Sequence, residues 1–209
     1  MKKSVLVIIS LFFVSCSTYT VEQEINKGII DKYKNSAIIF RLPKSSPVSG
    51  EELEKNFNNW LAGFKKNNRL LMINNANDKI KTYDSDFNRF YQISDSNKFL
   101  LEKTMGSLSA FNRENDIELK KIISENGLDS LIFYEIDSFF SSTIQYMSFT
   151  SVIVIFDAEG KINYLDHQSD AYHTEEVSPF HSKIKMNLMD KMCERLIEEL
   201  LKLDYIEKE

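Results

Sequence analysis

The chain has 209 residues, of which 43% are hydrophobic and 27% charged, a balance typical of a folded globular protein. Only six glycines and three prolines are present, which excludes collagen-like and low-complexity classes. The formal net charge of −5 argues against a broad phosphate-binding surface, so nucleic acid is not an expected partner.

The N-terminus has the pattern of a secretory signal peptide. Lys2 and Lys3 supply a positive start, and the almost uninterrupted apolar run Val5–Val14 follows them. A helix of this length spans about 15 Å, whereas the hydrocarbon core of a bilayer is ~30 Å thick. The run is therefore too short for a permanent transmembrane helix, and we expect cleavage between Ser15 and Cys16.

Cys16 is the candidate lipidation site. The stretch Phe13-Val14-Ser15-Cys16 resembles the lipobox of bacterial lipoproteins, with Phe13 at a position where leucine is usual. This resemblance implies that the Cys16 thiol carries a diacylglycerol and that acyl chains such as palmitate replace the lost hydrophobic segment as the membrane anchor. The alternative is an ordinary secreted protein with a cysteine at that position. By the same resemblance, Ser17 after the lipidated cysteine favours the outer membrane.

The expected organisation is a signal peptide at 1–15, a lipidated N-terminus and tether at 16–35, and a single α/β domain at 36–209. A short helix is predicted within the tether, around Val21–Tyr33. Cleavage removes two lysines and makes the body more acidic, so anionic lipid would repel it. Attachment is therefore expected through acyl chains rather than through a basic patch.

A strand, a helix and a second strand are predicted first in the domain. Ala37–Leu42 is a β-prone run stopped by Pro43. Ser49 and Glu52 have the spacing of a capping box, which predicts a helix start. The apolar face of this helix comprises Leu53, Phe57, Trp60, Leu61 and Phe64; Trp60 is expected to pack in the core rather than to form an exposed platform. Arg69–Asn74 is the second predicted strand.

A helix and a meander of three strands are predicted in the second half. The segment 79–113 has no clear periodicity, whereas Asn115 and Glu118 indicate a helix start and Gly127 its end. The apolar residues between them are Ile117, Leu119, Ile122 and Ile123. The three predicted strands are Ser130–Phe140, Ile144–Phe156 and Lys161–His173. Asp157–Gly160 forms a tight turn between the last two strands.

A long C-terminal helix is expected to cover the sheet. Ser151–Phe156 is apolar on both faces, which predicts a central strand buried on both sides. Ser178 is the predicted N-cap of the last helix, and Pro179 lies in its first turn. Its apolar face comprises Ile184, Leu188, Met189, Met192, Cys193, Leu196, Ile197, Leu200 and Leu201. The predicted fold class is α/β (α+β): a single-domain sandwich with a mainly antiparallel sheet, a C-terminal three-strand meander and covering helices.

The order of these elements resembles a recurring module of envelope lipoproteins. The residues that carry the resemblance are Gly127-Leu128-Asp129-Ser130 and Asp157-Ala158-Glu159-Gly160-Lys161. The families are the curli-secretion lipoproteins and the lipoproteins that activate penicillin-binding proteins. The resemblance implies an α/β sandwich used for assembly or protein activation rather than for catalysis. It identifies no partner and no functional residue.

No pattern of chemistry-bearing residues amounts to a catalytic or metal site. If the strand around His167 and His173 is extended, these residues lie about 20 Å apart, too far to bind one ion. With Asp166, Asp170 and His181 they are expected to form a solvated strand rim, so neither a metal nor a cofactor is predicted. Cys193 lies in the helical apolar face and is expected to be a core residue rather than a nucleophile.

Two further candidates are rejected. Glu135 and Asp137 alternate on one strand face but are expected to be an exposed charged face rather than an acid/base pair. The stretch 106–110 lacks the second glycine of a nucleophile elbow. The favoured function is a non-catalytic, lipid-anchored envelope protein acting through protein–protein interaction or self-assembly. The alternative is an envelope hydrolase or a small-ligand-binding lipoprotein, and the side of the membrane on which the protein faces stays open.

Overall fold

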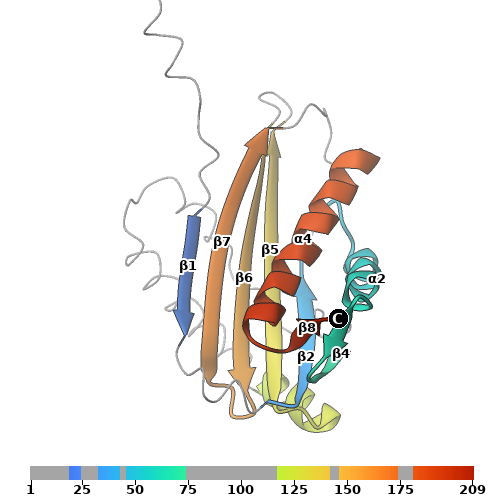
Figure 1. Cartoon of the computed structure of the whole chain (residues 1–209). Helices are drawn as coiled ribbons and strands as arrows, with labels where there is room; N and C mark the ends of the chain where they lie inside the picture. The colour runs from blue at the N-terminus through green and yellow to red at the C-terminus, as the bar shows by residue number, and fades with distance from the viewer. Residues whose placement is uncertain (1–18, 25–32, 43–45, 74–116, 142–145, 174–180) are drawn as a thin grey trace, which may run out of the picture.

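The computed structural model describes residues 19–24, 33–42, 46–73, 117–141, 146–173 and 181–209. A six-stranded sheet has the order β1-β7-β6-β5-β2-β4 (Figure 1). Strand β3 pairs with β8 in a separate two-stranded ribbon. The strands are β1 (Tyr19–Glu24), β2 (Asn35–Arg41), β3 (Phe64–Lys66), β4 (Arg69–Met72), β5 (Ser130–Ser141), β6 (Tyr146–Asp157), β7 (Ile162–His173) and β8 (Ile206–Lys208). The helices are α2 (Gly50–Leu61), α4 (Ser182–Lys202) and an unlabelled one at 117–126.

The sheet is mainly antiparallel, as predicted. Strands β5, β6 and β7 form the expected meander, and β1 adds an antiparallel edge to β7. Strand β2 runs parallel to both β4 and β5. Helix α2 lies between β2 and β4 in the chain and supplies the crossover that a parallel pair requires. The α+β class, with helices covering a mainly antiparallel sheet, is confirmed.

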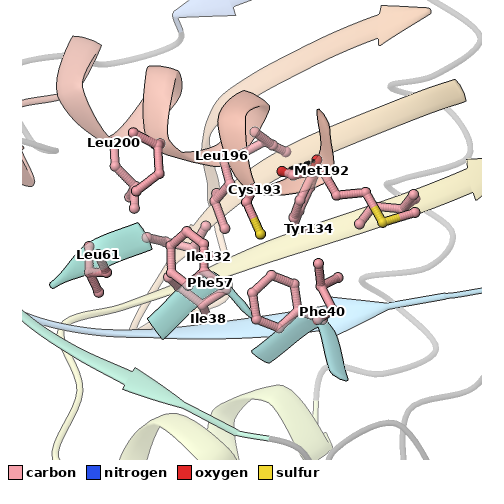
Figure 2. Close-up of a cluster of buried hydrophobic side chains, with 14 of the residues drawn as sticks. Ile38, Phe40, Phe57, Leu61, Ile132, Tyr134, Met192, Cys193, Leu196 and Leu200 are labelled. Carbon is pink, nitrogen blue, oxygen red and sulfur yellow. Dashed lines mark hydrogen bonds between the residues drawn. The ribbon is translucent and has the colours of Figure 1, made fainter. Parts of the chain in front are cut away.

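The larger core lies between the sheet and helices α2 and α4. The Tyr134 hydroxyl donates a hydrogen bond to the Met192 carbonyl oxygen over 3.0 Å, which ties β5 to α4 (Figure 2). The Phe40 and Phe57 rings meet edge to face, 5.6 Å between their centroids. Buried members from the helices are Leu53, Phe57, Leu61, Ile184, Leu188, Met192, Cys193, Leu196, Ile197 and Leu200. Met189, Leu201 and Trp60 are partly buried against them. The predicted apolar face of α4, the part of the α2 face from Leu53 to Leu61 and the packing of Trp60 are therefore confirmed.

A second core lies on the opposite face of the sheet, under the helix at 117–126. The helix contributes Leu119, Ile122 and Ile123, which pack with strand residues such as Val152, Val154 and Phe156. Ile153 and Ile155, which alternate with these residues on β6, belong to the larger core. Strand β6 is therefore internal and buried on both faces, as predicted. Ile117, however, is 80% exposed and does not belong to the apolar face.

Two predicted chain reversals are present. Gly127 follows the helix at 117–126 with φ of 60°, and Gly160 has φ of 79°, a region that favours glycine. The Asp157 carboxylate accepts hydrogen bonds from the backbone N–H groups of Glu159 and Lys161. Each turn therefore depends on one glycine, and the second also depends on one carboxylate.

Asp129 joins the starts of two neighbouring strands. Its Oδ2 atom accepts hydrogen bonds from the backbone N–H groups of Lys34 and Asn35, at 2.8 and 2.9 Å. Its own N–H donates to the Asn35 carbonyl oxygen over 2.7 Å. The aspartate after Gly127 thus aligns β2 with β5, a role that the sequence pattern did not reveal.

Helix α2 begins as predicted, with Ser49 as N-cap. The Ser49 hydroxyl accepts from the Glu52 N–H, and the Glu52 carboxylate accepts from the Ser49 N–H. The Lys185 ammonium also donates to Glu52, over 2.7 Å. The helix ends at Leu61, so the prediction that Phe64 continues its apolar face is wrong. Phe64 begins β3, after the chain turns at Gly63.

Replacing Ser49 by alanine is expected to lower the free energy of unfolding by about 1 kcal/mol, because the Glu52 backbone N–H loses its side-chain acceptor. Urea unfolding followed by circular dichroism at pH 7 measures this change. Glu51→Gln is the matched control, since Glu51 is an exposed residue of the same helical turn. An equal loss in both variants would contradict the capping role.

The capping box also predicts a dependence on pH. The hydrogen bond from Lys185, followed by that from the Ser49 backbone, lowers the pKa of Glu52 from 4.5 to about 2. A carboxylate with a depressed pKa in the fold stabilises it above its ordinary pKa. The stability difference between the wild type and Glu52→Gln is therefore expected to be complete above pH 4.5 and to disappear as the pH falls toward 2. A difference that stays constant across this window would contradict the assignment.

Two boundary predictions are wrong. Residues Tyr19–Glu24 form strand β1 rather than the start of a helix in the tether, because their backbone groups pair along the free edge of β7. Helix α4 begins at Ser182, and the His181 side chain accepts from the Lys183 N–H as its N-cap, so the cap is not Ser178. The other predictions for 43, 79–113, 115, 144 and 179 lie outside the described residues.

Candidate functional site

The predicted lipidation site precedes the first described strand by three residues in the sequence. Ser15 and Cys16 lie outside the described residues, and strand β1 begins at Tyr19. In the described part of the chain, no helix is long and apolar enough to cross a membrane. The lipidation and the cleavage before Cys16 stay predictions.

The predicted histidine and aspartate group is divided between strand β7 and the start of helix α4. His167 lies within β7, His173 ends this strand, and His181 caps α4. Asp166 is only 1% exposed, so the prediction of a solvated rim is wrong for this residue. Among the residues that the structure describes, no three His, Cys, Asp or Glu side chains are grouped so that they could hold a metal ion.

Asp166 instead belongs to a buried charged cluster between β7 and α4, formed with Tyr164, Arg195 and Glu199. The Arg195 guanidinium makes an ion pair with Asp166, and its Nη1 atom donates to Glu199 Oε1 over 2.6 Å. The Tyr164 hydroxyl donates to the other oxygen of Glu199. Arg195 is 6% exposed and Glu199 5%. Two carboxylates therefore share one guanidinium beneath the C-terminal helix.

Lys202 also contacts this cluster, through Tyr164. Its ammonium donates to the Tyr164 hydroxyl oxygen over 3.3 Å and lies 5.8 Å from the centre of the Tyr164 ring. The arrangement pairs both acids and leaves neither Asp166 nor Glu199 open to solvent. The cluster therefore joins α4 to β7 through buried, paired charges.

Cys193 lies in the larger core, as predicted. Its side chain is 1% exposed and receives a weak hydrogen bond from the Asn56 amide, 3.5 Å from the sulfur. Burial raises the pKa of the Cys193 thiol to about 12. Since the thiolate is the nucleophilic form of cysteine, this residue is suited to packing and not to catalysis.

Cys193 is expected not to react with an alkylating reagent at pH 8 in the native protein, because its pKa of about 12 keeps it protonated. The measurement is the intact mass of a Cys16→Ala variant, in which Cys193 is the one remaining cysteine. The same variant carrying Ser182→Cys is the matched control, since Ser182 is exposed and its thiol should react. Rapid native alkylation of Cys193 would contradict its core role.

Glu135 is partly buried, so the prediction of an exposed charged face is wrong for this residue. It lies opposite Arg41 in the β2–β5 register. Arg41 is 8% exposed, and its guanidinium carbon lies 5.9 Å from the centre of the Phe133 ring. Burial lowers the pKa of Arg41, and Glu135 opposes this shift. The Asp137 side chain and the stretch 106–110 lie outside the described residues.

Three residues of the buried cluster, Tyr164, Arg195 and Glu199, were missed by sequence reasoning. Arg195 and Glu199 continue the spacing of Leu188 and Met192 on the buried face of α4. A charged pair four residues apart on an apolar helical face was the available signal. Nothing near Asp166 in the sequence indicated that it would meet this pair.

Comparison with known proteins gives structural likenesses alone. No known protein family matches the chain, and neither does any curated protein. A PelC dodecamer structure from Paraburkholderia phytofirmans aligns with a TM-score of 0.47 and 7% identity, covering 90% of this chain and 97% of that chain. Lipoprotein GNA1162 from Neisseria meningitidis aligns with a TM-score of 0.35 and 10% identity, covering 79% of this chain and 99% of that chain. Likenesses at TM-scores below 0.5 carry no argument about activity or partners.

Proposed function

We propose that this chain is a lipid-anchored protein of the bacterial cell envelope that acts through protein–protein interaction or self-assembly rather than catalysis. The observation that carries the proposal is the sequence of a positive start, a short apolar run and Ser15-Cys16 at its end. A cysteine at this junction supplies the thiol to which a diacylglycerol is attached. The acyl chains, rather than any protein segment, hold the protein on the membrane.

The packing of the described residues supports a non-catalytic role. The side chains that could act as a nucleophile or as an acid in this part of the chain are buried. They are Cys193, Asp166 and Glu199, and they lie between α4 and the sheet. General acid/base and nucleophilic catalysis both need a group that reaches the substrate. These residues therefore support a folded scaffold that acts by binding another protein at its surface.

The proposed location is the outer membrane, since Ser17 rather than aspartate follows the lipidated cysteine. The expected partner is an envelope protein or a second copy of the chain. Nucleic acid is not a proposed partner, because the net charge of −5 disfavours binding to polyanions. No cofactor is part of the proposal.

In-cell crosslinking of the wild type tests the proposal, followed by separation of inner and outer membranes, sizing in detergent and mass spectrometry of the captured proteins. We expect a defined homomer or one reproducible envelope partner in the outer-membrane fraction. The Cys16→Ala variant is the matched control, because it should lose the complex by leaving the membrane. A monomer without a partner would contradict the proposal and favour an envelope hydrolase or a ligand-binding lipoprotein.

A further inference from the structure

The register of strand β1 shows toward which end of β7 its first residue, Tyr19, lies. Tyr19 lies opposite Ser169 and Glu24 lies opposite Tyr164, so β1 runs antiparallel to β7. The start of β1 therefore points toward the C-terminal end of β7. Cys16 precedes this start by three residues.

The C-terminal end of β7 belongs to one end of the whole sheet. His173 pairs with Tyr146 at the start of β6, and Tyr146 pairs with Ser141 at the end of β5. We call these three strand ends the hairpin end. The opposite end of the same strands carries the tight turn at 157–160 and is the turn end.

Helix α4 also begins at the hairpin end. Its residue Glu199 contacts Tyr164, and Arg195 contacts Asp166 farther along β7. The helix therefore runs antiparallel to β7, and its first residue, Ser182, lies toward the end of that strand (Figure 1).

The length of the connection between Cys16 and Tyr19 decides which of the two ends Cys16 can approach. Three residues span at most about 11 Å, which limits the distance between the Cα atoms of Cys16 and Tyr19. From the level of Ser169, opposite Tyr19, the hairpin end is about 13 Å away along β7, whereas Ile162 at the turn end is about 23 Å away. The Cα atom of Cys16 can therefore come close to the level of the hairpin end, but it cannot reach the level of the turn end.

We infer that the hairpin end faces the lipid bilayer once Cys16 is acylated, an inference that rests on the proposed lipid anchor. The inference rests on this covalent reach. Charge does not decide it, because Lys185 at the start of α4 pairs with Glu52 and Lys161 follows Asp157 and Glu159 at the turn end.

Depth-dependent fluorescence quenching tests this orientation on the acylated full chain. Single labels are placed on Ser182→Cys at the hairpin end and on Ala158→Cys at the turn end, two exposed positions; the buried Cys193 stays unlabelled in the native protein. The chain is reconstituted into vesicles of phosphatidylethanolamine and phosphatidylglycerol whose headgroups carry a quencher. Strand β6, from Tyr146 to Asp157, separates the ends by about 36 Å, far beyond contact quenching.

We expect quenching at Ser182→Cys to be several-fold stronger than at Ala158→Cys. Equal or reversed quenching overturns the orientation while the anchor stands, provided that the labelled chain floats with the vesicles. A chain that does not float overturns the anchor and the orientation together. As a control on reach, a long Gly/Ser insertion after Thr18 should equalise the two labels without preventing flotation; a difference that persists would overturn the role of the short connection.

Discussion

Replacing Arg195 by methionine is expected to lower the free energy of unfolding by about 3–5 kcal/mol, because it leaves two buried acids without their cation. Asp166 loses its ion pair and Glu199 keeps only the hydroxyl of Tyr164. The side chains have similar length, so the loss reports charge more than volume. Urea unfolding at pH 7, with the wild type measured in parallel, determines the change.

Glu198→Ala is the matched control for this variant. Glu198 lies on the same helix but is exposed, so its removal should change the free energy of unfolding by less than about 0.5 kcal/mol. The double variant Asp166→Asn/Arg195→Met should lose less stability than the sum of the two single changes, since neither residue then leaves the other unpaired. Strict additivity would show that the two side chains do not interact.

Replacing Cys16 by alanine is expected to abolish acylation and to release the protein from the membrane fraction. Each buried CH₂ group of an acyl chain contributes about 0.8 kcal/mol to membrane binding, and an acidic protein offers no comparable attraction to anionic lipid. Labelling of cells with radioactive palmitate, followed by membrane fractionation, measures both effects.

Cys193→Ala is the control for the anchor, because Cys193 is the other cysteine of the chain and is buried in the fold. This variant should retain both the palmitate label and the membrane location. Continued labelling of Cys16→Ala, or loss of labelling in Cys193→Ala, would place the lipid elsewhere.

Much of the fold follows from local patterns in the sequence. Strand β6 was predictable because Val152–Phe156 offers apolar side chains to both faces. Helix α4 was predictable from the helical spacing of its buried residues. The turn at Asp157–Gly160 was predictable because a carboxylate precedes a glycine that adopts positive φ.

The remaining features depend on contacts between distant residues. The short polar strand β1 is defined by pairing with β7, and its own six residues do not distinguish it from an extended tether. The placement of β2 between β4 and β5 depends on both neighbours and on Asp129. The buried cluster unites Asp166 with Arg195 from another element, and no local rule identifies such a pair.

Mass spectrometry of the N-terminal peptide, from wild-type protein extracted from its host's membranes, tests the lipid anchor most directly. The account predicts a chain that begins at Cys16 and carries a diacylglyceryl group on its sulfur. A chain that retains Met1, or that begins at an unmodified residue after another cleavage site, would contradict the anchor and with it the proposed place of the protein on the membrane.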